Sequence, residues 1–233
     1  MAYNKTISCR GDRGVITDDQ KGEGMDKKAM YRLSYGLFVL TAARDGKDNG
    51  CITNTAIQVT SEPNCIAVAV NKANYTHDMI ANTKKFNVSI LSEKADFEVF
   101  KHFGFQSGRD VDKFAGYTEC KRTENGLMII TEGTNAYISV DVDQMVDLGT
   151  HTLFIGKVTD LDVLSDVPSA TYAYYQANIK PKPGDEGKKE QLPPSMHKWR
   201  CKICGYEYIG ETLPDDFICP LCKHPASDFE LVE

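Results

Sequence analysis

The sequence predicts a mainly β protein made of an antiparallel barrel, a linker and a small cysteine-rich module. Apolar and polar residues alternate along stretches such as 137–143, the pattern of strands with one face on a core. Turn-forming residues separate such stretches, as at 45–50. Four cysteines gather near the C-terminal end. We therefore expect the barrel over 25–178, the linker over 179–197 and the module over 198–233.

The elements of the barrel follow from periodicity and turn chemistry. A short helix begins at Asp26 and leads through Gly36 into a strand over 37–43. The turn at 45–50 returns the chain into a second strand over 51–60. Further strands are predicted over 66–71, 86–91, 127–131, 136–145 and 152–164, and shorter helices over 76–82 and 95–102. This set of strands is typical of a closed antiparallel barrel.

The composition excludes several classes of protein. The net charge is -6 and the pI is near 5.4, without the basic face that nucleic-acid binding requires. The longest apolar runs, such as 38–43 and 66–70, are far shorter than the roughly 18 residues of a membrane span. Scattered cysteines are typical of free thiols in a reducing cytoplasm, and here they are Cys9, Cys51, Cys65 and Cys120. We therefore expect a cytoplasmic protein that binds neither nucleic acid nor membrane.

Two segments lie outside the expected folded domains. Residues 1–24 carry balanced charges and lack the apolar stretch of a signal peptide, so we expect a disordered or expression-derived arm. Residues 180–194 are rich in proline, glycine and charge, which indicates a flexible linker. Such a linker allows the C-terminal module to take different positions.

The C-terminal cysteines form two CxxC pairs, Cys201 with Cys204 and Cys219 with Cys222. This is the spacing of two knuckles that close one tetrahedral four-sulfur metal site. A module this small buries too little surface to fold unaided, so metal binding contributes much of its folding free energy. Zinc and iron both suit four thiolates, and the spacing leaves both open.

The residues around these cysteines resemble rubredoxin, in the shortened form found at the end of rubrerythrins. The resemblance is carried by 204–206, 213–217, 219–220 and 228–230. It implies one iron in the four-cysteine site and a role in electron transfer, with a structural zinc ribbon as the alternative. Acidic residues outnumber basic ones over 196–233, which favours a protein redox partner over nucleic acid.

The barrel carries no familiar nucleotide motif. No GxGxxG follows an expected strand and no GxxxxGK[ST] occurs, so neither a Rossmann nor a P-loop site is indicated. The barrel instead resembles the flavin reductase-like, FMN-binding split barrel, on the strength of 35–41, 54–60, Pro63, 71–77 and 149–158. The resemblance implies an antiparallel split β-barrel with short helices, bound FMN, and a homodimer with FMN at the subunit boundary.

The resemblance also implies cofactor-binding residues. The FMN phosphate would lie where a strand ends and a helix begins, and the residues there are Asn71, Lys72, Asn74 and Thr76. The isoalloxazine ring would lie along a strand segment that contains Asn54, Thr55, Ala56 and Gln58. The alternatives are a simple helix cap at Asn74 or Thr76 and an ordinary threonine-rich strand.

Three further residues are assigned near the cofactor. His151, the catalytic candidate, resembles the family's histidine where nicotinamide stacks; we expect it to orient or stabilise charge, because hydride transfer needs no general base. A surface or hairpin position is the alternative. Arg109 or Lys113 would contact flavin or the dinucleotide phosphates, with helix capping and surface ion pairs as the alternative. We interpret His77 and His102 as structural.

The whole chain resembles the high-molecular-weight rubredoxins, which are fusions of a flavin reductase and a rubredoxin from anaerobic bacteria. In that family, FMN reduced by NAD(P)H passes electrons through the iron to a diiron flavoprotein that removes oxygen or nitric oxide, a defence against oxidative stress. The fusion is chemically sensible because nicotinamide donates a hydride, whereas a single iron accepts one electron, and a flavin can divide the pair. NADH and NADPH both stay open as donors.

Two alternative functions stay open. One is a flavin or ferric reductase in which the rubredoxin module is an accessory. The other is an electron carrier that a separate reductase reduces. Bleaching by NAD(P)H under anaerobic conditions would separate the reductases from the carrier.

Overall fold

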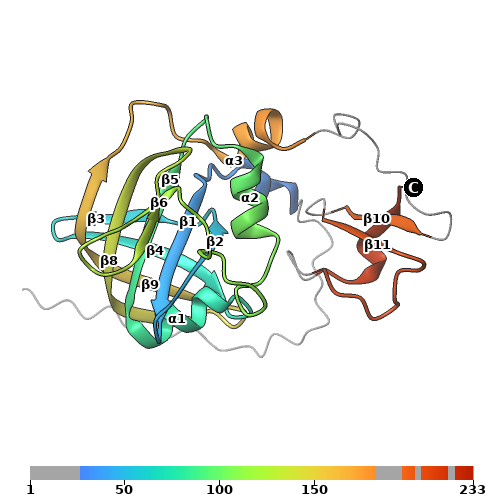
Figure 1. Ribbon diagram of the computed structural model, residues 1–233, viewed down its shortest axis with the longest axis horizontal. Coiled ribbons are helices and arrows are strands. Elements are labelled where there is room, and N and C mark those ends of the chain that lie inside the picture. The colour runs from blue at the N-terminus through green and yellow to red at the C-terminus, as the bar shows by residue number, and fades with distance from the viewer. Residues whose placement is uncertain (1–26, 182–195, 203–205, 220–223, 233) are drawn as a thin grey trace, which may run out of the picture. The chain divides into compact units, whose positions relative to one another are not determined.

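The computed structural model describes residues 27–181, 196–202, 206–219 and 224–232 (Figure 1). The predicted N-terminal arm and most of the predicted linker lie outside these residues. Among the described residues, 27–33 and the part that begins at Ser34 belong to separate units, and the first contains the 3-10 helix η1 (Lys27–Arg32). Within the described ranges, no helix combines the length and apolar character needed to pass through a bilayer.

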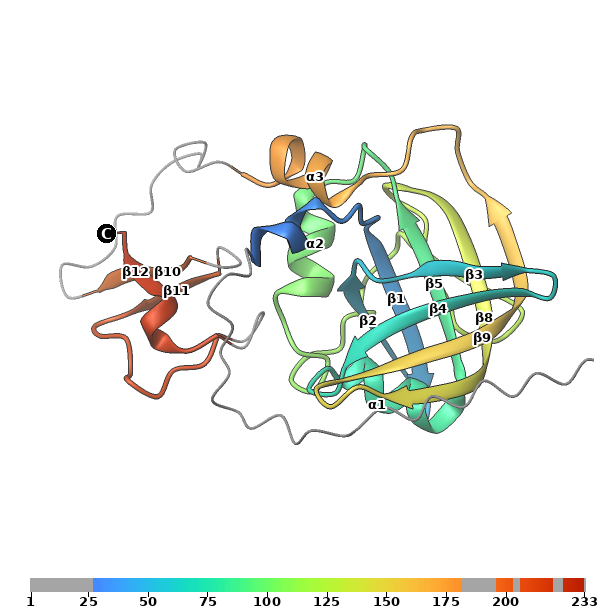
Figure 2. The same ribbon diagram turned by 180° about the vertical axis from the view of Figure 1, so that it is seen from behind.

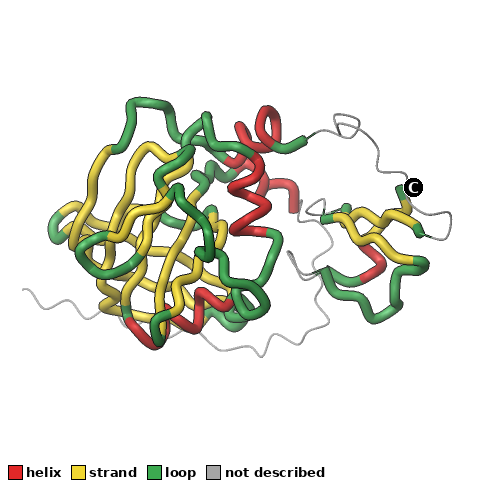
Figure 3. The backbone as a smooth tube through the Cα atoms, in the orientation of Figure 1, coloured by secondary structure: helices red, strands yellow, loops and turns green. Residues whose placement is uncertain are grey.

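The barrel is a single seven-stranded sheet whose neighbouring strands are all antiparallel. Its strands are drawn in yellow in Figure 3. The strands lie in the order β2, β1, β5, β8, β9, β4, β3. Their bounds are β1 Phe38–Arg44, β2 Lys47–Thr53, β3 Ile57–Ser61, β4 Asn64–Asn71, β5 Lys85–Leu91, β8 Thr134–Asp147 and β9 His151–Val163. A separate two-stranded ribbon pairs β6 (Cys120–Arg122) with β7 (Met128–Ile130). The predicted mainly β, antiparallel architecture is confirmed.

The two edges of the sheet are β2 and β3, which are consecutive in the sequence. The single strand predicted over 51–60 is wrong, because β2 pairs with β1 whereas β3 pairs with β4. Residues 54–56 therefore carry the chain from one edge of the sheet to the other. Thr55 holds this crossing, since its Oγ1 donates to the Ala69 carbonyl oxygen at 2.8 Å. The sheet is thus split between β2 and β3, and the fully closed barrel suggested by the strand pattern is also wrong.

The interior of the barrel is apolar and closed at one end by α1 (Tyr75–Thr83). Leu40 of β1, Phe86 of β5 and Phe154 of β9 are fully buried there, and α1 adds Met79 and Ile80. Each such side chain contributes about 1.5–3 kcal/mol by leaving water. In Figure 2, β3 and β4 cross the direction of β1 and β5, the arrangement that encloses this core.

The helix α2 (Phe97–Gly104) covers the other face of β1. Its apolar side packs Val99, Phe100 and Phe103 against a second core cluster that includes Leu37 and Val39. The short α3 (Tyr172–Tyr174) and the π-helical turn η2 (Tyr175–Ile179) follow β9 and place the Tyr175 ring 4.5 Å from that of Phe100. Because β1 is buried on both faces, it is a central strand of the fold.

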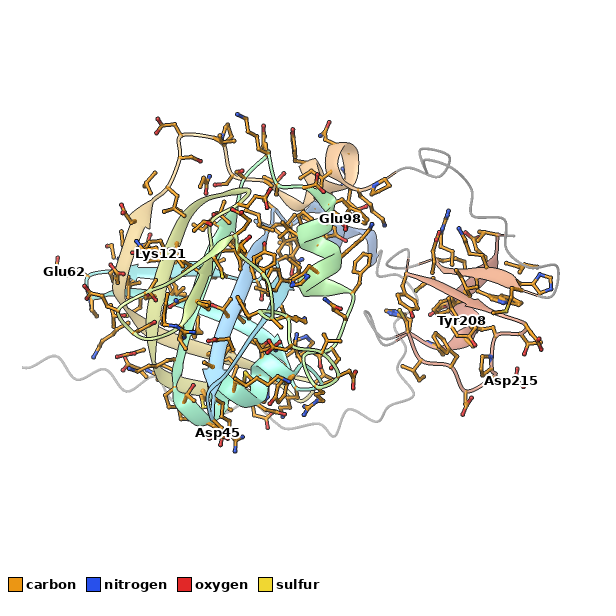
Figure 4. All side chains as sticks on the ribbon, viewed as in Figure 1. Asp45, Glu62, Glu98, Lys121, Tyr208 and Asp215 are labelled. Atoms are coloured by element: carbon orange, nitrogen blue, oxygen red, sulfur yellow. The ribbon has the colours of Figure 1, made fainter. Side chains whose placement is uncertain are left out.

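The C-terminal module is a small three-stranded sheet with its own core. The strands β10 (His197–Cys201), β11 (Glu207–Gly210) and β12 (Phe229–Leu231) lie in the order β11, β10, β12, and η3 (Ala226–Asp228) precedes β12. Figure 4 labels Tyr208 and Asp215 in this module, and Asp45 and Glu62 at two turns of the barrel. The module's core contains Cys201, Cys219 and Phe229, with Trp199, Tyr206, Tyr208, Leu213 and Phe217 packed around them.

Candidate functional site

A pocket of about 250 Å³ opens between β2, the start of α1 and the loop that follows α2. Three of the predicted site residues line it, namely Asn71, Asn74 and Lys113. The other lining residues are Cys51, Ile52, Ala73, Tyr75 and residues 103–108. A larger hollow of about 570 Å³ beside α2 contains none of the predicted site residues. The smaller pocket is therefore the candidate cofactor site of the barrel.

The strand-to-helix segment from β4 to α1 forms one wall of this pocket. Asn74 caps α1 through its Oδ1, which accepts from the Thr76 backbone N–H at 3.0 Å. Asn71 ends β4, and its Oδ1 accepts from the Ala73 N–H at 2.8 Å. The Thr76 hydroxyl is fully buried and accepts from Asn49 Nδ2 at 2.9 Å. The two asparagines therefore face the pocket, whereas the threonine hydroxyl has a partner behind it.

Lys72 and His151 lie beside this wall but do not line the pocket. Lys72 Nζ donates to Asp147 Oδ1 at 2.6 Å, and this bond holds the pKa of the exposed Asp147 carboxyl below its usual value. His151 begins β9 and lies directly opposite Asn71 in the β4–β9 ladder. Its Nδ1 lies 2.9 Å from the Thr150 Oγ1. The structure thus brings both residues to the same end of the barrel as Asn71.

The segment assigned to the flavin ring is the crossing between the two sheet edges. Asn54, Thr55 and Ala56 are half-buried there, and Ala56 packs against the barrel core. Gln58 lies exposed on β3, where its Nε2 donates to Asn64 Oδ1 at 3.0 Å. None of the four lines the 250 Å³ pocket. They border the split in the sheet instead.

The loop after α2 forms the opposite wall and is fastened to β2. Lys47 Nζ donates to the Gly108 carbonyl oxygen at 2.6 Å. Gly108 itself packs tightly, because a Cβ built there would lie 2.0 Å from Asn49 Oδ1. Asn49 is only 1% exposed, and this Oδ1 has no hydrogen-bond partner among the described residues. Only glycine fits this close approach of the loop to β2.

Arg109 fastens the same loop to α1. Its Nη2 lies 2.6 Å from Asp78 Oδ2, and its guanidinium carbon lies 4.9 Å from the centre of the Tyr75 ring. Partial burial of the Asp78 carboxyl works against ionisation, but hydrogen bonds from Arg109 and His77 lower its pKa. Lys47 Nζ lies 5.4 Å from the centre of the same Tyr75 ring. Two cations therefore flank the aromatic ring at the rim of the pocket.

Lys113 lies inside the fold rather than on its surface. The residue is 3% exposed, and its Nζ donates to the carbonyl oxygens of Gly50 and Phe103, each at 2.8 Å. Burial lowers the pKa of its amine to about 8, and the neighbouring Cys51 acts in the opposite direction. Burial raises the pKa of the Cys51 thiol, against hydrogen bonds with Thr76 and Asn74. A neutral thiol and an ammonium therefore lie together at this pocket at neutral pH.

The two histidines interpreted as structural have internal partners. His77 Nε2 lies 2.9 Å from the Thr152 Oγ1, and its ring lies against that of Phe154. His102 Nε2 lies 2.6 Å from the Lys113 carbonyl oxygen, and its ring stacks on Tyr117. Both imidazoles join neighbouring elements, which agrees with a structural role.

Two of the four predicted metal ligands are described, and both are buried. Cys201 is 1% exposed and Cys219 is 0% exposed, and they belong to the same core cluster. The Cys201 N–H donates to the Tyr206 carbonyl oxygen and the Cys219 N–H donates to the His224 carbonyl oxygen, both at 2.8 Å. Each bond joins its cysteine to the residue five positions further along the chain. Cys204 and Cys222 lie outside the described residues, so the four-cysteine site stays a prediction.

Sequence reasoning missed four residues of the pocket region: Lys47, Asn49, Cys51 and Gly108. Lys47 and Gly108 meet only after folding, and no local pattern joins them. Asn49 and Cys51 alternate along β2 and are both buried, but Asn49 lies in the stretch that the sequence predicts as a turn, so its burial was not indicated. Buried polar groups on a core face are uncommon and mark a special environment.

Two known families match the chain in order. Residues 30–182 match the flavin reductase like domain, and residues 199–230 match the rubrerythrin, rubredoxin-like domain. The barrel resembles the FMN-binding protein of Thermus thermophilus with a TM-score of 0.55 at 19% identity, over 62% of this chain and 79% of that one. These matches define the class as an oxidoreductase of the flavin reductase type with a rubredoxin-like electron-transfer domain.

The chain belongs to the family of the high molecular weight rubredoxin of Moorella thermoacetica, to which it is 37% identical over 230 residues, 89% of this chain and 100% of that protein. The barrel is also 39% identical over 158 residues to a ferric-chelate reductase (NAD(P)H) of Archaeoglobus fulgidus, which covers 68% of this chain and 93% of that protein. The predicted resemblance is confirmed for both domains.

Proposed function

We propose that the protein is an NAD(P)H-dependent oxidoreductase that passes electrons by way of FMN in the barrel and iron in the C-terminal module to a partner protein. The observation that carries this proposal is the fusion of the two domains in one chain. A nicotinamide gives up two electrons together as hydride, whereas a single iron takes one. A bound flavin is therefore needed to accept the pair and pass the electrons on one at a time. The proposed domains are 25–178 and 198–233, joined by 179–197.

The pocket fits the phosphate end of FMN. Gly108, which packs against Asn49, lines one wall of this pocket, and Asn71 and Asn74 line the other. Lys72 would reach a phosphate by leaving Asp147, and the Thr76 backbone N–H would reach it by leaving Asn74 Oδ1. Arg109 and Lys113 supply the positive charge. The ring would lie at the split in the sheet, against Asn54, Thr55, Ala56 and Gln58, with His151 orienting the nicotinamide.

The C-terminal module fits a thiolate-bound metal. Cys201 and Cys219 are buried in one aromatic core, and Cys204 and Cys222 would complete the set. A shell of aromatic side chains excludes water and suits an electron-transfer iron. When bound, iron would accept and release one electron at a time.

A second copy of the chain is the proposed partner of the barrel's exposed sheet face. Ile57 and Val59 on β3 are 62% and 44% exposed, and Val146 and Leu148 near the β8–β9 turn are 41% and 54% exposed. Exposed apolar residues in such number mark an interaction surface. The proposed homodimer would cover this face.

The acceptor is proposed to be a second redox protein, such as a diiron flavoprotein that reduces oxygen or nitric oxide. The acidic C-terminal module supports a protein acceptor with a complementary basic surface. The described cysteines of the barrel, Cys51, Cys65 and Cys120, are free thiols, which suits the proposed cytoplasmic location.

A ferric reductase with an accessory rubredoxin module is the second candidate. It is favoured by the identity of 39% to the ferric-chelate reductase (NAD(P)H). In that case ferric chelates would be reduced as fast without the module as with it. The third candidate is an electron carrier that a separate reductase reduces, and the test below distinguishes it from the other two.

Anaerobic visible spectroscopy of the full chain tests the proposal. We expect flavin and ferric-thiolate bands, and both should bleach on addition of NADH or of NADPH. Bleaching of the flavin alone would favour the ferric reductase, and no bleaching would favour the carrier. A colourless protein that contains zinc would contradict the proposal.

A further inference from the structure

The buried ammonium of Lys113 has no counter-charge among the described residues. Its Nζ lies within hydrogen-bond distance of two carbonyl oxygens, those of Gly50 and Phe103, and no carboxylate pairs with it in the described ion pairs. An ammonium has three N–H donors, so one is left over. Burying a charge is costly unless it is paired. The side chain also lines the 250 Å³ pocket, so a ligand there can supply the missing charge.

We infer that Lys113 is the buried counter-ion for a phosphate group in this pocket, and that phosphate binding is coupled to protonation of its amine. This inference rests on the proposed function and deepens it. A neutral amine would keep donors for the two carbonyl oxygens but would offer the phosphate no charge. Binding of the anion therefore requires, and retains, the proton on Lys113.

The surroundings of Lys113 allow this coupling to be observed. The titratable groups around it are Cys51 on β2, His102 on α2, and Tyr117 in the loop that follows. Burial raises the pKa of Cys51, and burial raises that of Tyr117 to about 12 with help from Glu132. The charged groups Lys47 and Arg109 lie over the ring of Tyr75, which lines the pocket. The amine of Lys113, with a pKa of about 8, is thus the group that changes charge just above neutral pH.

The test is the dissociation constant of FMN from the full chain freed of flavin, measured by fluorescence between pH 7 and 9.5. Wild-type affinity should fall about tenfold per pH unit above pH 8. Lys113→Arg stays protonated and should bind FMN without this step. Lys113→Met should bind weakly at every pH. Lys121→Met, which removes an exposed lysine on β6, is the matched control and should behave as the wild type.

Riboflavin separates a phosphate from a ring contact, because it lacks the phosphate. Its affinity should show no step near pH 8 and should be the same in Lys113→Met as in the wild type. If only the affinity for NADH fell above pH 8, the phosphate that pairs with Lys113 would be one of the dinucleotide's. Equal FMN affinity of the wild type and Lys113→Met across the pH range, with no step for NADH, would overturn the inference.

Failure of the flavin proposal is a separate result. If the full chain bound no FMN at any pH, inorganic phosphate would still decide the role of Lys113. Carbon-13 NMR of the lysine Cε groups should show the Lys113 resonance titrating near pH 8, and phosphate should move that titration upward. No movement at saturating phosphate would overturn the inference. Thermal unfolding of each variant shows whether the fold is intact.

Discussion

Lys113 shows how a folded protein can hold a charged side chain in its interior, where burial of the charge costs free energy. The aliphatic stem packs inside the fold, and two carbonyl oxygens replace part of the water that the ammonium loses. Burial still lowers the pKa of the amine from 10.5 to about 8. The folded protein therefore holds this proton less tightly than the unfolded chain does.

This difference predicts a pH dependence of stability. Between about pH 8 and 10.5 the unfolded chain keeps the proton that folded Lys113 has lost, so the free energy of unfolding should rise with pH. The contribution should reach roughly 3 kcal/mol at the top of this range. Urea unfolding from pH 7 to 10.5 measures this contribution as a gain in stability that the wild type shows and Lys113→Met, which has no amine, lacks. If the free energies of unfolding of the two proteins changed with pH in parallel, the pH dependence could not be assigned to Lys113.

At the residue scale, local motifs were predictable and distant contacts were not. The Asn74 cap of α1 follows from an asparagine placed two residues before Thr76, and both lie within one turn. The burial of Lys113 depends on Gly50 and Phe103, which approach it only once α2 packs on the sheet. A charged residue in a loop is ordinarily solvated, so nothing nearby indicated otherwise.

At the scale of elements, three contacts hold the loop after α2 at Gly108 and Arg109. Lys47 bonds the Gly108 carbonyl oxygen, Arg109 pairs with Asp78, and the Gly108 backbone lies against Asn49. Two of these contacts are partly exposed ion or hydrogen bonds, which are individually weak. The third contact, of Gly108 with the Asn49 side chain, depends on steric fit and not on charge.

Gly108→Ala should therefore loosen this wall of the pocket. The new Cβ would lie 2.0 Å from Asn49 Oδ1, so the loop or β2 must move. We expect a loss of about 1–3 kcal/mol in stability and weaker FMN binding, measured by urea unfolding and flavin fluorescence. In a double-mutant cycle, Asn49→Ala should make room for the methyl group and reduce the cost of Gly108→Ala. Fully additive effects would show that the two residues do not meet.

The predicted strands and helices agree with the structure where periodicity is local. The clearest departure is 51–60, where a threonine-rich stretch without glycine or proline reads as one strand; the predicted turn over 45–50 also proves to be mostly β2, and β6, α3 and η2 were not predicted. The break at 54–56 arises because β2 and β3 pair with different strands, β1 and β4. Long-range pairing of this kind leaves no mark on the local sequence.

At the scale of the molecule, two independently recognisable domains share one chain. The barrel has two apolar core clusters of its own, and the C-terminal module has a third built around cysteines and aromatic rings. The spacing of the cysteines was sufficient to predict the module, because metal ligation constrains sequence strictly. The placement of Cys204 and Cys222 stays a prediction.

Separate cores predict separable functions. Cys219→Ser should abolish iron binding and electron delivery to the acceptor, because the metal supplies much of the module's folding free energy. The rate of flavin reduction by NAD(P)H should stay within about twofold of the wild type. Stopped-flow absorbance at the flavin and iron bands measures both, with Cys65→Ser on β4 as the matched control. An equal fall in flavin reduction would contradict the two-domain scheme.

The split in the barrel affects how the sequence of this protein can evolve. The gap between β2 and β3 is spanned by residues 54–56, and no strand pair depends on the length of that span. An added residue there would widen the gap while every rung of the sheet stayed in register. The segment proposed to meet the flavin ring can therefore be remodelled for a bulkier or slimmer ligand without rebuilding the scaffold that carries it.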